Sequence, residues 1–139
     1  MGLDMYLTGD KYIGGSLQNT EPFQEIEGKP VERIILELGY WRKHAKLHGY
    51  IVKNFAHNGV DDQEKIELTS DNLKQIVNAI RNKDLPKTKG FFFGNDEIDE
   101  MHAQEDNENI KRFEDAIEWL GNLSEGDNWR RAVYYQASW

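Results

Sequence analysis

Apolar and polar residues alternate with period two, loosely in residues 3–13 and more clearly in the tail 129–139, a pattern typical of strands with one buried face. Residues 31–40 are rich in β-branched side chains, which also favours a half-buried strand. Shorter strands are expected at residues 23–26 and 65–68. Because Glu, Leu and Arg are good helix formers, a helix over residues 31–40 is the competing interpretation.

Three further stretches place apolar residues at the spacing of an amphipathic helix. The predicted helices cover about residues 41–56, 70–84 and 106–120. Asn58 and Gly59 close the first helix, because they tolerate the left-handed conformation of a cap. Thr69 or Ser70 caps the second helix. No linker or repeat divides the chain, so the sequence predicts one α+β domain over residues 1–139, with a mainly antiparallel sheet and about three helices.

The composition predicts a soluble protein of the cytoplasm. The chain has 139 residues and no cysteine, which excludes disulfides, thiolate metal sites and cysteine nucleophiles. The mean hydropathy is −0.79, and no apolar run is long enough to span a membrane. The N-terminal residues do not have the pattern of a signal peptide.

The net charge of −8 is concentrated in the acidic segment, residues 95–127. This segment carries twelve acidic and two basic residues, and the rest of the chain has fifteen basic and thirteen acidic residues. We therefore expect no binding to bulk nucleic acid, which needs a basic surface. A small anion in a locally basic pocket remains compatible with this charge, since salt screens repulsion beyond about 8 Å.

The predicted helix 41–56 carries most of the candidate chemistry. It would place Trp41, His44 and His48 on or beside one face, within an arc of about 160°. Arg42 and Lys43 would stand at its N-terminus, where free N–H groups attract anions; a solvated helix face is the alternative. The two histidines are spaced like zinc ligands, but the general-base glutamate of that motif is missing, so no metal site is expected.

Three consecutive phenylalanines between glycines, at residues 90–94, suggest either a surface on which bases stack or part of the core. No phosphate-binding loop, dinucleotide fingerprint or nucleophile motif is present. An enzyme that uses His48 or His44 as an acid–base group is therefore the least favoured function.

Four segments of the sequence, MGLDMYL, GYWRKHAKLHGY, LPKTKGFFFG and YYQASW, resemble together a family of small, largely uncharacterised phage and prophage proteins. The resemblance extends over the whole chain. It implies a viral setting and a set of candidate residues, but no reaction. The residues that carry over are Asp4, Tyr40, Trp41, Arg42, Lys43, His48, Phe92, Gly94, Tyr135, Ser138 and Trp139.

The sequence thus predicts a phage-type accessory protein that binds a small anionic or nucleotide-derived ligand and sequesters a host defence signal. It predicts no catalytic residue, metal or cofactor, and it leaves the oligomeric state open. The alternatives are an inhibitor whose acidic segment 95–127 imitates nucleic acid and binds a host enzyme, and a nucleotide-processing enzyme. One pocket is expected, lined by Trp41, His48 and a residue of the last strand. The predicted ligand-binding residues are Asp4, Trp41, Arg42, Lys43, His48, Phe92, Tyr135 and Trp139.

Overall fold

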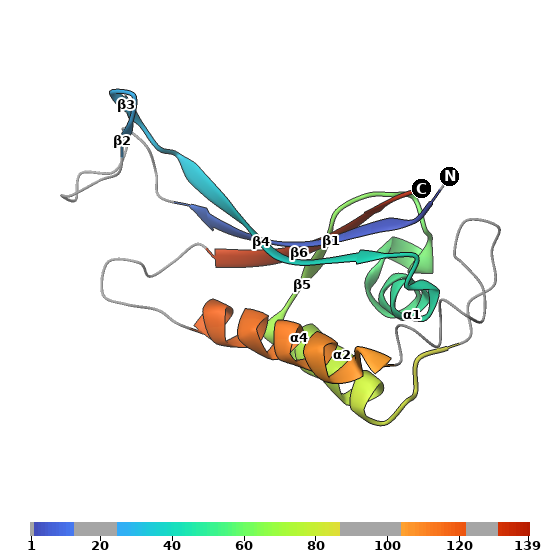
Figure 1. The fold of residues 1–139 in the computed structure, drawn as a ribbon. Helices are drawn as coiled ribbons and strands as arrows, with labels where there is room; N and C mark the ends of the chain where they lie inside the picture. The colour runs from blue at the N-terminus through green and yellow to red at the C-terminus, as the bar shows by residue number, and fades with distance from the viewer. Residues whose placement is uncertain (1, 13–24, 87–103, 122–130) are drawn as a thin grey trace.

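A computed structural model describes residues 2–12, 25–86, 104–121 and 131–139 (Figure 1). The predicted α+β class is confirmed. The elements in chain order are β1 (Asp4–Tyr12), β2 (Glu25–Ile26), β3 (Lys29–Pro30), β4 (Arg33–Arg42), α1 (Ala45–Phe55), the 3-10 turn η2 (His57–Gly59), β5 (Ile66–Leu68), α2 (Ser70–Arg81), α4 (Asp106–Gly121) and β6 (Arg131–Ser138).

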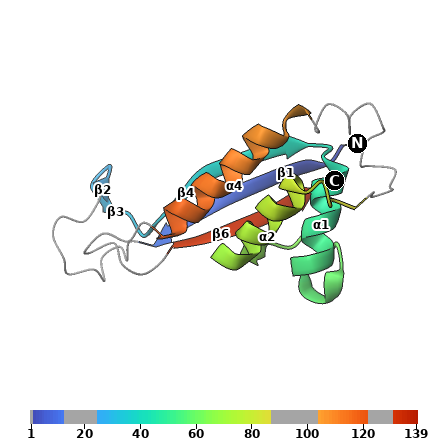
Figure 2. The ribbon, with the colours of Figure 1, turned by 90° about the horizontal axis from the view of Figure 1, so that it is seen from below.

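Four strands form an antiparallel sheet in the order β4-β1-β6-β5, and β2 and β3 form a separate small hairpin. The first and last of the described strands, β1 and β6, are therefore the two central strands of this sheet. The sequence predicted a strand at each of these two places. Helices α1, α2 and α4 all lie on the same side of this sheet (Figures 1 and 2). The described part of the chain places no helix on the other side, so these residues form two layers.

The core lies between the sheet and the helices. Successive residues of a strand point to opposite faces, and in β1 the side chains of Met5 and Leu7 are buried whereas Tyr6 between them is exposed. The largest fully buried side chains of the described residues come from β1, β5, β6 and the three α-helices and include Leu7, Ile51, Leu68, Leu73, Ile76, Phe113, Val133 and Tyr135. No described helix combines the length and the apolar character of a membrane span.

The predicted start of the first helix at residue 41 is wrong. Trp41 and Arg42 are the last residues of β4 and pair with β1. Lys43 then turns the chain with a φ of 56°, and its N–H donates to the carbonyl of Leu3 at 2.7 Å. The ring of His44 caps α1, since its Nδ1 accepts from the backbone N–H of Leu47 at 3.4 Å. Strand pairing and burial of the indole therefore override the helical pattern at this point.

The other predicted elements agree with the structure to within a few residues. Residues 31–40 belong mainly to β4, so the competing helix is wrong. Thr69 caps α2, because its side chain accepts from the N–H of Asn72 while the Asn72 side chain accepts from the N–H of Thr69. Of the expected strand at 23–26, the structure describes only Glu25–Ile26, which is β2. The aromatic segment at 90–94 lies outside the described residues.

Gly39 provides a test of the packing between β4 and the core, because the indole of Trp41 covers it. A Cβ at this position would lie 2.7 Å from Cη2 of that ring. We expect Gly39→Ala to lower the free energy of unfolding by about 1 to 3 kcal/mol, since the ring must move away from its site. Urea denaturation followed by circular dichroism measures this change.

Gly121 at the end of α4 is the matched control, because a Cβ there would meet no atom within 4 Å. Gly121→Ala should change the free energy of unfolding by less than about 0.5 kcal/mol. If the two variants are equally stable, the indole does not cover Gly39 as described.

Candidate functional site

The alternation of the strands divides the predicted site residues between the two faces of the sheet. Trp41 and Tyr135 point toward the helices, where His48 of α1 also lies buried. Asp4 and Arg42 belong to the opposite face. Since neighbouring residues of a strand point in opposite directions, Trp41 and Arg42 do not contribute to one site on this sheet.

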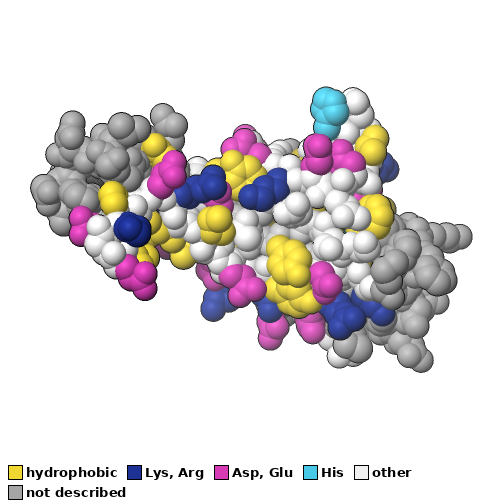
Figure 3. Space-filling view, turned by 90° about the horizontal axis from the view of Figure 1, so that it is seen from above, with side chains coloured by type: hydrophobic (Ala, Val, Ile, Leu, Met, Phe, Trp, Pro, Cys, Tyr) yellow, Lys and Arg dark blue, Asp and Glu magenta, His cyan; other side chains and the backbone are white. Residues whose placement is uncertain are grey.

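On the uncovered side of the sheet, six cross-strand neighbours form a group that we call the open-face cluster. Two residues of β1, Asp4 and Tyr6, form the middle of the group. Two residues of β4 lie on one side of them and two residues of β6 on the other. Figure 3 looks onto this side, where hydrophobic, basic and acidic side chains are intermixed. The open-face cluster consists of Asp4, Tyr6, Tyr40, Arg42, Gln136 and Ser138.

Two tyrosine rings form the centre of the open-face cluster. The rings of Tyr6 and Tyr40 lie with their centroids 5.3 Å apart and their planes tilted by 51°. Their side chains remain exposed, at 40% and 41% of the residue surface. The hydroxyl of Tyr40 donates to Oδ1 of Asp4 at 2.6 Å, and this hydrogen bond to the carboxylate raises the pKa of the Tyr40 phenol. The bond holds the Tyr40 hydroxyl in place while 41% of the residue remains exposed.

The helix side of the sheet contains a different arrangement, the histidine cluster, formed by His48, Asp61, Tyr135 and Trp139. Nδ1 of His48 lies 2.6 Å from the hydroxyl of Tyr135, and Nε2 lies 2.7 Å from Oδ2 of Asp61. The indole Nε1 of Trp139 donates to Oδ1 of the same carboxylate at 3.3 Å. The histidine cluster therefore joins α1, the segment before β5, β6 and the residue that follows β6.

Burial determines how protons are placed in the histidine cluster. It raises the pKa of Tyr135 well above its ordinary value, so the phenol stays protonated and donates to Nδ1 of His48. With the phenol as donor to Nδ1, the Nε2 hydrogen of His48 points to Oδ2 of Asp61, so both hydrogens have an acceptor.

The histidine cluster has the order carboxylate, imidazole, hydroxyl that hydrolases use to activate a nucleophile. However, only 1% of Tyr135 and 2% of His48 is exposed. The adjoining cavity has a volume of about 10 Å³, which holds one water molecule at most. A substrate cannot reach the hydroxyl, so we interpret the cluster as a structural connection.

The expectation that Trp41 and His48 line one pocket is wrong, because Trp41 does not line this cavity. Its indole stacks on Phe113 at 5.3 Å with an interplanar angle of 9°, and its Nε1 donates to Oδ1 of Asn109 at 2.7 Å. The guanidinium of Arg112 lies 5.6 Å from the indole. Trp41 is therefore a core residue that joins β4 to α4.

Sequence reasoning missed Asp61 and Asn109, which are the hydrogen-bond partners of the buried side chains of His48 and Trp41. Asn109 had a detectable signal, because it stands four residues before Phe113 on the buried side of α4. Asp61 had none, since it is one of two adjacent aspartates in an irregular segment. Phe92 lies outside the described residues, and Lys43 forms the turn after β4.

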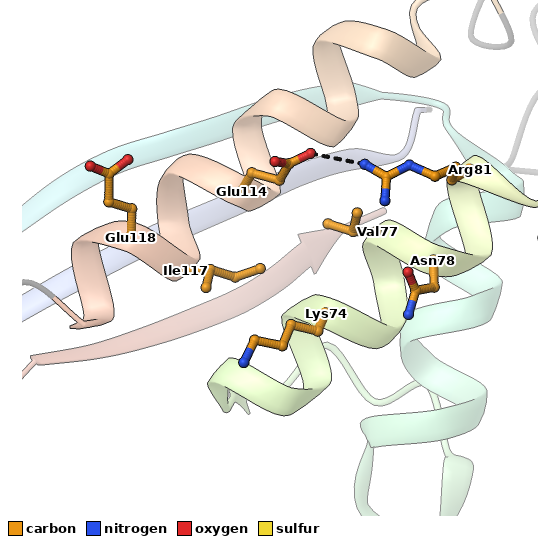
Figure 4. A pocket seen from close by; sticks show the side chains of 7 residues that line it. All are labelled: Lys74, Val77, Asn78, Arg81, Glu114, Ile117 and Glu118. Atoms are coloured by element: carbon orange, nitrogen blue, oxygen red, sulfur yellow. Dashed lines mark hydrogen bonds and ion pairs between the residues drawn. The ribbon is translucent and has the colours of Figure 1, made fainter.

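A groove of about 440 Å³ runs between α2 and α4 on the opposite side of the molecule from the open-face cluster (Figure 4). Arg81 and Glu114 bridge it with a 3.1 Å ion pair, although both side chains are more than half exposed. None of the predicted site residues lines it. The lining residues are Lys74, Val77, Asn78, Arg81, Glu114, Ile117 and Glu118.

The groove offers an anion no net attraction, because Glu114 and Glu118 on its α4 wall balance the charges of Lys74 and Arg81 on its α2 wall. Of the acidic segment 95–127, the structure describes residues 104–121. Within it α4 has five acidic and two basic residues. Among the described residues, no three His, Asp or Glu side chains gather as metal ligands would.

Comparison of the chain with protein-family models, curated proteins and solved structures found no match. The resemblance to phage proteins therefore stays a prediction from the sequence motifs.

The histidine cluster predicts that Tyr135→Phe destabilises the protein. The substitution leaves the buried Nδ1 of His48 without its donor, which costs about 1 to 3 kcal/mol of unfolding free energy. Tyr134→Phe is the matched control, because the neighbouring tyrosine points to the other face and is partly exposed. Equal stability of the two variants in urea denaturation would contradict the hydrogen bond.

The open-face cluster predicts that Asp4→Asn lowers the pKa of Tyr40 toward its ordinary value of 10.0. In the folded protein the raised pKa favours the protonated phenol. The protonated Tyr40 phenol therefore contributes its full stabilisation below the pKa that Tyr40 has in the unfolded chain. This stabilisation is lost as the pH rises through the pKa of Tyr40 in the folded protein. An alkaline titration of the phenol carbon by NMR measures the shift. Asp62→Asn, in an exposed loop, should leave the titration unchanged.

Proposed function

We propose that the chain is a binding module without catalytic activity, and that its open-face cluster takes a small nucleotide-like anion. The observation that carries this proposal is the pair Tyr6 and Tyr40, two adjacent rings that remain about 40% exposed on the uncovered side of the sheet. Exposed aromatic rings are stacking surfaces for nucleobases, worth about 1 to 3 kcal/mol per base.

The residues around the two rings supply the polar contacts that such a ligand requires. Arg42 is an exposed cation two residues after Tyr40 on the same face of β4, opposite Asp4. A guanidinium binds phosphate in a bidentate manner, which suits an anionic group attached to a stacked base. On the other side of β1, the amide of Gln136 and the hydroxyl of Ser138 offer both donors and acceptors to the edge of a base.

The histidine cluster and the groove between α2 and α4 are less suitable sites for such a ligand. The histidine cluster is closed to anything larger than water, and in the groove between α2 and α4 two glutamates balance the charges of Lys74 and Arg81. An open surface with two rings, one cation and the carboxylate of Asp4 favours a single nucleotide unit over a long polyanion, which the net charge of −8 repels. In the phage setting that the sequence motifs imply, such a module sequesters a nucleotide-derived host signal.

The test is a titration of the isotopically labelled protein with a panel of mononucleotides, cyclic nucleotides and ADP-ribose, followed by NMR. We expect at least one member to shift the resonances of Tyr6, Tyr40 and Arg42. Tyr6→Leu keeps an apolar strand residue but removes the ring, and it should weaken binding about tenfold. Arg42→Gln should weaken binding and reduce its dependence on salt.

Lys53→Gln is the matched control for the cation, because Lys53 is exposed on α1, away from the open-face cluster. It should leave the affinity unchanged. Shifts confined to residues 74–81 and 114–118 would move the site to the helix groove, and no shift with any member of the panel would refute the proposal.

A further inference from the structure

The edge strand β4 has an unusual exposed surface. It lies at one margin of the sheet, it is 10 residues long, and only its β1 side is paired among the described strands (Figure 2). Ile35 is 55% exposed and Leu36 is 39% exposed. Because these neighbours point to opposite faces, apolar side chains are exposed on both sides of the same strand.

The two edges of the sheet differ. The opposite edge, β5, has only 3 residues, and its middle residue is the exposed Glu67. Short edges and charges are the usual protection against pairing with another chain. β4 has a register irregularity opposite Leu7 and Thr8, but the stretch Arg33–Glu37 before it pairs regularly with β1. A long, regular and apolar edge favours the addition of another strand.

We propose that two copies of the chain associate through β4 and form a continuous eight-stranded sheet. Two identical edges related by a twofold axis perpendicular to the sheet pair in antiparallel fashion, and each residue then faces a residue on the same side of the sheet. With the axis at Ile35, this residue meets its own copy. Arg33 faces Glu37 of the second copy, and Ile34 faces Leu36.

This register is complementary in both charge and polarity. On the uncovered side of the sheet, two Arg33–Glu37 pairs flank the Ile35 pair, and on the helix side two Ile34–Leu36 pairs form. Opposite charges and apolar residues directly across from each other stabilise an antiparallel pair. Moving the axis by one residue, to Leu36, would instead place Ile35 opposite Glu37. The guanidinium of Arg33 is within reach of a new partner, since its 3.7 Å ion pair with Asp10 leaves the side chain 56% exposed.

The dimer is independent of the proposed nucleotide binding. Tyr40 is five residues from the axis, which corresponds to about 17 Å along the strand. The two open-face clusters therefore stay separate in the dimer, and neither needs the other copy.

Sedimentation velocity over a range of protein concentrations tests the proposal. The wild-type chain should show a concentration-dependent dimer. Arg33→Glu and Glu37→Arg should each weaken dimerisation by about tenfold or more, because each places like charges opposite one another twice. The double variant that exchanges the two charges restores both pairs, and its dimerisation constant should return to within about threefold of the wild-type value.

Glu67→Arg on the opposite edge is the control and should leave the dimerisation constant unchanged. Circular dichroism of each variant shows whether the monomer is folded. A wild-type chain that remains monomeric at all concentrations would overturn the proposal. A dimer that Glu67→Arg disrupts, or that the double exchange fails to restore, would overturn the β4 interface.

Discussion

The arrangement of this protein depends on a sheet that is covered on one side only. The central strands β1 and β6 come from the two ends of the chain, and all described helices pack against the same face of this pair. Alternation along each strand then assigns every side chain either to the core or to the open side. Tyr40 and Trp41 illustrate the result, since one is 41% exposed and the other is 2% exposed although they are adjacent.

The buried polar side chains hold the two layers together. His48 links α1 to β6 and to Asp61, and the indole of Trp41 links β4 to Asn109 of α4. Buried polar groups are costly unless they are hydrogen-bonded. These contacts therefore favour one arrangement of the helices over others of similar hydrophobic burial. They also explain why polar residues that look catalytic in the sequence serve the fold.

Much of the fold was predictable, because the periods of two and 3.6 residues report burial directly. The start of α1 was not, since it depends on the contact of Lys43 with Leu3 and on the burial of Trp41, which are tertiary interactions. The candidate site was predicted only in part. Asp4, Tyr40, Arg42 and Ser138 lie together in the structure, but only the register of three strands reveals this.

The central claim is that the sheet separates exposed tyrosines from buried aromatic residues. Paramagnetic relaxation of the side-chain NMR signals by a soluble gadolinium chelate measures this exposure directly. We expect strong broadening of the ring signals of Tyr6 and Tyr40, and little effect on Trp41 and Tyr135, because only the first two rings face solvent. Equal broadening of all four rings, or protection of Tyr6 and Tyr40, would contradict the account.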